Sequence, residues 1–154
     1  MTFTFSTYRL EVDVEATRAW YAAQTLPGVT CDCAGCRNFL RAADAMPAPV
    51  RDFLCRLGAD PLRPAELCYY SGTPEKLYGG GWYHICGRIL EGAVPPGSRQ
   101  AFGEWLELAE GFSAAFKPEC DLLAEDFPRP CFQMELNHCY PWVLAEANPY
   151  AEET

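Results

Sequence analysis

Apolar and charged residues alternate from Tyr8 to Glu15, which is the period-two pattern of a strand with one buried face. Phe3 and Phe5 continue the alternation in the opposite phase. The change of phase at Ser6-Thr7 predicts a bulge or a break there, because one extra residue moves every later side chain to the other face. The first elements expected are therefore an extended segment and a strand around residues 8–12.

Apolar residues recur at helical spacing in four later segments. The clearest begins near Pro49, carries apolar residues at positions i, i+3, i+4 and i+7 from Val50, and stops at Gly58. The helices expected are residues 13–24, capped by Asp13 and ended by Leu26-Pro27-Gly28; residues 37–45, ended by Pro47; residues 49–57; and residues 98–110, ended by Gly111.

Further strands are expected at residues 66–70, 82–90, 112–116 and 132–138, where polar and apolar residues alternate or β-prone residues cluster. Gly79-Gly80-Gly81 reads as part of the loop that joins the first two into a hairpin, and residues 119–126 read as a helical turn. Short strands interleaved with helices predict one α+β domain over residues 1–154, with a mostly antiparallel sheet, helices on one face and a Cys-rich loop.

The chain has the length and composition of one ordinary domain. Its 154 residues are 49% hydrophobic and 14% aromatic, which is ample for a packed core. Residues 1–10 contain neither a signal peptide nor a membrane span, so we expect a cytoplasmic protein that binds no membrane. Thiols stay reduced there, so nine cysteines, an odd number, indicate core residues plus a metal or redox cluster.

The net charge of −9 is concentrated in the last third of the chain. Residues 1–103 carry ten acidic and ten basic side chains, whereas residues 104–154 carry eleven acidic and two basic ones. Such a surface repels phosphate backbones, so nucleic-acid binding is not expected. It could attract a basic protein partner, although a solvated acidic face that only favours solubility is the simpler interpretation.

Three cysteines lie within six residues, at Cys31, Cys33 and Cys36. Gly35 permits a tight reversal that aims their sulfurs at one point, and clustered thiolates suit Zn²⁺ or an iron–sulfur centre. The sequence therefore predicts a structural zinc site with a fourth ligand from elsewhere in the chain, for which we take Cys86. The alternatives are His84, which would share a strand face with Cys86, and His138, Cys139, Cys55 and Cys68.

A redox function competes with the metal site. Cys33 and Cys36 directly precede a helical pattern, where a helix N-terminus lowers the pKa of a thiol. Cys31 is then an unexplained third thiol. A Cys nucleophile with His84 or His138 lacks an assignable third residue, so we assign no catalytic residue and favour a role other than an enzyme. Gly79-Gly80-Gly81 lacks the Lys-Ser/Thr that would follow in a phosphate-binding loop.

Several short motifs together resemble a family of small bacterial proteins with the pattern CxCxxCxNF and no known activity. They are the Cys33-to-Phe39 segment, the end of the helix at Leu57-Gly58 with Asp60-Pro61, Gly80-Gly81-Trp82-Tyr83-His84 and Pro141-Trp142-Val143. The resemblance implies a self-contained bacterial domain and no substrate.

The residues themselves leave three function classes: a binding or accessory domain with structural zinc, an acidic immunity- or antitoxin-like protein for a basic partner, and a thiol oxidoreductase using Cys33 and Cys36.

Overall fold

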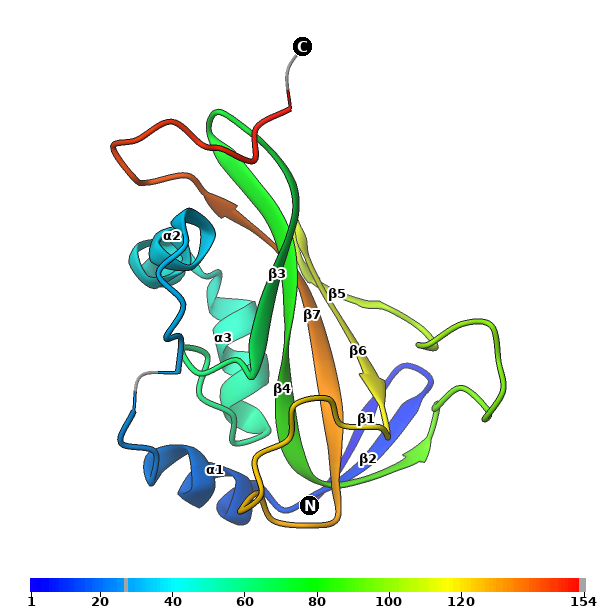
Figure 1. Cartoon of the computed structure of the whole chain (residues 1–154). Coiled ribbons are helices and arrows are strands. Elements are labelled where there is room, and N and C mark those ends of the chain that lie inside the picture. Colours follow the sequence, from blue (N-terminus) through cyan, green and yellow to red (C-terminus); the bar gives the residue numbers. More distant parts are fainter. Residues whose placement is uncertain (27, 153–154) are drawn as a thin grey trace.

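The longest strand, β4 (Lys76–Glu91), is the element against which the other strands assemble (Figure 1). One edge of β4 pairs with β7 (Cys131–Pro141), and its other edge pairs first with β3 (Glu66–Thr73) and then with β2 (Tyr8–Val12). Beyond these lie β1 (Thr2–Phe5), next to β2, and β6 (Phe112–Lys117) and β5 (Leu106–Ala109), next to β7. All of these pairings are antiparallel.

The computed structural model describes residues 1–26 and 28–152. Within them, α1 (Val14–Ala22), α2 (Ala34–Ala42) and α3 (Ala48–Arg56) lie on one side of the sheet, with the short 3-10 helix η1 (Ala43–Ala45) after α2 (Figure 1). The predicted α+β fold, with a mostly antiparallel sheet and helices on one face, is confirmed. Pro27, part of the predicted end of the first helix, and residues 153–154 of the predicted domain lie outside the described residues.

Local chemistry explains where the elements begin. The phase change at Ser6-Thr7 is a tight turn between β1 and β2, with Ser6 at a φ of 53°. Asp13 caps α1 as predicted, since its Oδ1 accepts a hydrogen bond of 3.0 Å from the backbone N–H of Ala16. None of the helices in the described part of the chain is long and apolar enough to cross a membrane.

The core lies between the helices and the face of the sheet that they cover, called the inner face below. Residues opposite each other in the β4–β7 pairing share a face, so Tyr83 and Ile85 pack beside Met134 and Phe132. The predicted apolar stripe of α3 fills the space above them. The buried core includes residues of β2, β4, β7 and α3 and the residue that follows α3, among them Leu10, Val12, Tyr83, Ile85, Phe132, Met134, Leu136, Val50, Leu54 and Leu57.

The predicted helix over residues 98–110 is wrong. Residues 106–109 instead form β5 on the edge of β6, where Leu106 lies opposite Ala114. The preceding residues are irregular, and Glu104 accepts hydrogen bonds from Ser6 and Thr7 in the β1–β2 turn. The sequence Leu-Glu-Leu-Ala fits both periods, and the free edge of β6 decides in favour of a strand because it supplies backbone hydrogen-bond partners.

Gly79, Gly80 and Gly81 do not form a loop but lie in the middle of β4. A Cβ atom on Gly80 would lie 2.4 Å from the hydroxyl of Tyr70, and one on Gly79 would lie 3.3 Å from the ring of Tyr69. The glycines therefore let aromatic rings from β3 lie on the strand itself. The predicted helical turn over residues 119–126 is also absent, and those residues form turns and irregular backbone.

Helix α1 seals a gap in the sheet. One segment of β4 pairs with β3 and a later segment pairs with β2. Between these two segments, the edge of β4 has no strand beside it. The hydroxyl of Tyr21 donates to the carbonyl of His84 at 2.9 Å and accepts from its N–H at 3.2 Å. Thr17 Oγ1 accepts from the N–H of Cys86 at 3.0 Å, and the N–H of Asp13 donates to the carbonyl of Cys86. Side chains of α1 thus replace the missing strand.

Candidate metal centre

Cys31, Cys33 and Cys36 form one group, as the sequence predicts. Their Sγ atoms all lie within 4.8 Å of one another, which is close enough for the three thiols to bind one metal ion. Cys31 is exposed, Cys33 is half-buried and Cys36 is buried. The group therefore lies at the surface but has one side inside the protein, and solvent reaches it from the side of Cys31.

The first turn of α2 positions these sulfurs. Cys33 has extended backbone and caps the helix, because its Sγ accepts the backbone N–H of Cys36 at 3.5 Å. Cys31 Sγ accepts the N–H of Cys33 at the same distance. The helix consequently starts at Ala34, before the predicted start at Arg37. Backbone N–H groups aimed at sulfur favour its ionised form, the form that binds metals.

Tyr69 of β3 closes the buried side of the group. Its hydroxyl donates a hydrogen bond of 3.0 Å to Cys36 Sγ. A Cβ atom on Gly35 would lie 2.4 Å from the Tyr69 ring, so only glycine allows this contact. The Tyr150 ring lies 5.2 Å from the ring of Tyr69. The thiol group is thus where α2, β3 and the C-terminal segment meet.

The surroundings separate the pKa values of the thiols. Burial raises the pKa of Cys36 to about 12, more than the hydrogen bond from Tyr69 lowers it. Partial burial also raises the pKa of Cys33, but hydrogen bonds from the Cys36 backbone and from neighbouring side chains outweigh burial and lower it overall. Burial and the adjacent Cys36 raise the pKa of Tyr69, so its hydroxyl stays protonated and remains a donor.

Cys86, the predicted fourth ligand, is not in the group. It lies opposite Cys131 in the β4–β7 pairing, on the outer face of the sheet, whereas Tyr69 and the thiols are on the inner side. His84 does share a strand face with Cys86, as expected, and there its Nε2 is 3.1 Å from Gln133 Oε1. Alternation along a strand shows which residues share a face, but the fold decides which face meets the helices.

The other proposed fourth ligands also remain outside the group of thiols found among the described residues. Cys68 and Cys139 each neighbour an inner-face residue, Tyr69 and His138 respectively, and so lie on the outer face. Cys55 is exposed on α3. His138 lies on the inner face beside Tyr69, since a Cβ atom on Gly79 would lie 3.0 Å from its Cε1 and 3.3 Å from the Tyr69 ring.

His138 is buried without a hydrogen bond to either ring nitrogen in the described part of the chain. Its ring lies 4.8 Å from that of Tyr140, whose hydroxyl is likewise unpartnered there. Burial lowers the pKa of His138 to about 4. The neighbouring Tyr69 and Tyr140 have a raised pKa, also from burial, and stay neutral; Arg51 is the charged group near Tyr140. His138 is therefore neutral in the folded protein.

Replacing His138 with leucine is expected to reduce acid destabilisation. The unfolded chain binds the proton near pH 6.5 and the folded chain only near pH 4, so stability is lost as the pH falls through this range. At pH 5 the loss should be about 2 kcal/mol. The free energy of unfolding, measured with urea at pH 7 and at pH 5, should decrease between the two by that much more in the parent than in His138→Leu. Equal decreases in the two proteins would contradict this prediction.

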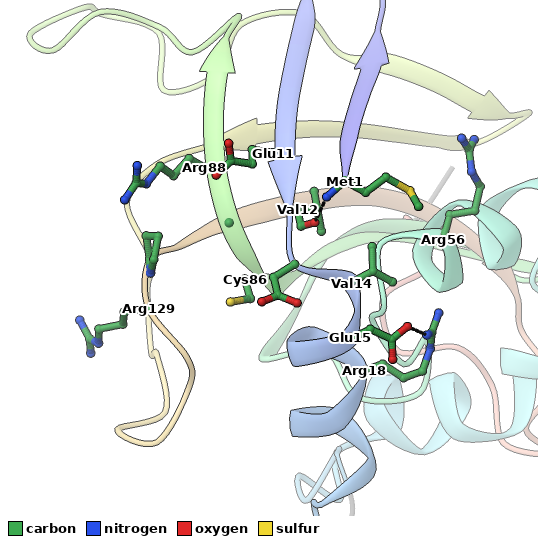
Figure 2. Close-up of a pocket in the computed structure, with 13 residues that line it drawn as sticks. Met1, Glu11, Val12, Val14, Glu15, Arg18, Arg56, Cys86, Arg88 and Arg129 are labelled. Atoms are coloured by element: carbon green, nitrogen blue, oxygen red, sulfur yellow. Dashed lines mark hydrogen bonds and ion pairs between the residues drawn. The ribbon is translucent and has the colours of Figure 1, made fainter.

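Two cavities are lined by cysteines of the predicted zinc site. One, of about 200 Å³, is lined by Cys31 and Cys36 together with Glu66 and Leu67, and gives the thiol group room for a small additional ligand. The other, of about 740 Å³, is at the far end of β4 (Figure 2). Some of its charged groups are engaged, since Arg18 pairs with Glu15 at 2.8 Å and the Met1 ammonium donates to the Val12 carbonyl, and the charged side chains of Glu11, Arg88 and Arg129 also line it.

Sequence patterns gave no sign of Tyr69 or Tyr150 beside the thiols, because both are distant in sequence and no spacing rule connects them.

The acidic residues of the last third do not form a helical stripe, and the carboxylate of Glu104 accepts hydrogen bonds from Ser6 and Thr7. No known family model, curated protein or solved structure matches the chain. What the chain does must therefore be inferred from the chemistry of its own side chains.

Proposed function

We propose that the chain is a small binding or accessory domain in which Cys31, Cys33 and Cys36 bind one structural Zn²⁺. The observation that carries this is the grouping of three Sγ atoms within 4.8 Å. Tetrahedral zinc with bonds of about 2.3 Å places thiolates about 3.8 Å apart, so small side-chain rotations bring the sulfurs to it. A water molecule or small ligand in the adjoining 200 Å³ cavity supplies the fourth position.

Zinc at this position would fix a part of the chain that has few apolar contacts of its own. Residues 28–33 include a single buried apolar side chain, that of Val29. Three bonds to one ion would join this segment to the first turn of α2, and through Cys36 and Tyr69 to β3. The metal would thereby hold α2 against the sheet.

Thiol–disulfide exchange is the second candidate, favoured by the position of Cys33 at the N-cap of α2 with Cys36 one turn later. In that reaction the Cys33 thiolate attacks a substrate disulfide and releases one substrate thiolate. Cys36 then loses its proton to water and attacks Cys33 Sγ, which releases the second thiolate. Two electrons pass to the substrate, and Cys33 and Cys36 end as a disulfide.

Metal and thiol analysis separates the two candidates. Protein purified under reducing conditions without added metal should contain about one equivalent of zinc, and Cys33→Ser should contain almost none. Cys55→Ser is the matched control, because Cys55 is exposed on α3 and outside the group. Folded protein without zinc, in which Cys33 and Cys36 form a reversible disulfide, would contradict the zinc site and support exchange.

A further inference from the structure

A second group of thiols lies at the other end of β4, on the outer face of the sheet. The Sγ atoms of Cys120 and Cys131 are 3.7 Å apart. Cys86 lies directly opposite Cys131 in the β4–β7 pairing. Both members of the 3.7 Å pair are half-buried, so reagents in solution can reach them. The zinc proposal uses none of these three cysteines.

The backbone around Cys86 brings it close to Cys131. The N–H and carbonyl of Cys86 bond to Thr17 and Asp13 on the opposite edge of β4, so Cys86 and Cys131 form a non-hydrogen-bonded pair. Side chains of such pairs are the closer ones in an antiparallel ladder. Cys131 therefore has two thiol neighbours, one across the ladder and one from the segment 118–130.

That segment holds Cys120 in place. It crosses the outer face, and the backbone of Asp121 accepts a hydrogen bond from Trp82 Nε1 at 3.0 Å and donates one to Gln133 Oε1 at 2.7 Å. Farther along, the Phe127 ring packs 4.8 Å from that of Trp20. Before Cys120, Lys117 of β6 pairs with Gln133 of β7, so both sides of Cys120 are anchored and the contact between the two sulfurs is a feature of the fold.

We propose that Cys120 and Cys131 form a reversible disulfide when the protein meets a low-molecular-weight disulfide such as oxidised glutathione. One thiolate of the pair attacks a sulfur of oxidised glutathione and a glutathione thiolate leaves. The second thiol loses its proton to water, attacks the mixed disulfide and releases the second glutathione thiolate. Two electrons pass to glutathione, and the sulfurs approach by about 1.7 Å to reach bonding distance.

The disulfide closes a ring from Cys120 to Cys131, which contains all but the first two residues of the crossing segment. This segment covers His84, whose ring lies 5.9 Å from that of Phe127, and Gln133, both of them buried. Closing a loop of this length should raise the melting temperature by roughly 5 to 10 °C. The modification thus makes the cover of the outer face respond to the thiol–disulfide balance around the protein.

Oxidation of the intact chain with graded ratios of oxidised to reduced glutathione tests this site. After the remaining thiols are blocked, a Glu-specific protease cuts after Glu119, Glu125 and Glu135 and places the two cysteines in separate peptides. A linked pair of peptides 120–125 and 126–135 is expected in the parent and in Cys86→Ser, and not in Cys120→Ser. The increase in melting temperature should follow the same pattern, whatever happens to Cys33 and Cys36.

Two results would overturn the proposal. One is that Cys120 and Cys131 remain free, or carry only glutathione, at ratios that oxidise an unfolded control of the same chain. The other is that Cys131 is recovered linked to Cys86, which would make the cross-strand pair the reactive one. Cys86→Ser separates these cases, because it removes the competing partner without changing Cys120.

Discussion

Replacing Cys33 with serine is expected to lower the melting temperature by roughly 8 to 16 °C in buffer that contains zinc. A ligand present at a thousand times its dissociation constant stabilises the folded state by about 4 kcal/mol, and loss of the central sulfur removes that contribution. Cys33 is the best position for this test because it both caps α2 and lies between the other two sulfurs in the motif.

Scanning calorimetry with and without a chelator provides the measurement. The parent should lose the same stability when zinc is removed, whereas Cys33→Ser should respond little to the chelator. Cys55→Ser should behave like the parent in both conditions, since Cys55 is an exposed residue of α3. If the chelator leaves the melting temperature of the parent unchanged and Cys33→Ser still melts at the lower temperature, the effect comes from the helix cap and not from a metal.

The double substitution Thr17→Val and Tyr21→Phe is expected to destabilise the fold by about 4 kcal/mol. It removes the two hydroxyls that bond the edge of β4, and leaves the N–H and carbonyl of His84 and the N–H of Cys86 without partners. Each buried backbone group left unpaired costs about 1 to 3 kcal/mol. The shape of the side chains changes little, so packing makes only a small contribution.

Urea unfolding, followed by tryptophan fluorescence and circular dichroism, measures this loss in the free energy of unfolding. Each single variant should lose less than the pair, and Tyr21→Phe should lose more than Thr17→Val because its hydroxyl serves two backbone groups. Tyr78→Phe is the matched control: Tyr78 is an exposed residue of β4, and its loss should cost under about 0.5 kcal/mol. A double variant within about 1 kcal/mol of the parent would refute the role of α1 as a substitute for a strand.

The fold was predictable wherever one period dominates the sequence. Alternation located β2, and the regular stripe starting at Val50 located α3, because each pattern fits one kind of element. Residues 106–109 fit both, and the free edge of β6 made them a strand. Gly79 to Gly81 also misled, because three glycines usually indicate a loop. Here their missing side chains admit the rings of Tyr69 and Tyr70, which only the fold brings there.

The metal centre was predictable only as far as its residues are local. Spacing grouped Cys31, Cys33 and Cys36 because a tight turn before a helix brings such residues together whatever the rest of the chain does. The assignment of Cys86 required knowledge of which sheet face the helices cover, and strand alternation does not contain it. Tyr69 reaches Cys36 only because β3 pairs with the glycine-rich part of β4.

The central position of β4 has a consequence for how the protein is made. A ribosome releases β2 and β3 before or with β4, but β7, which pairs along most of the other edge, begins only at Cys131. During that interval Tyr83 and Ile85, which end up in the core, belong to a half-paired strand exposed to water. Unpaired edges with apolar faces readily join other chains. The nascent chain is therefore expected to be most prone to aggregation from the synthesis of β4 until Pro141 leaves the ribosome.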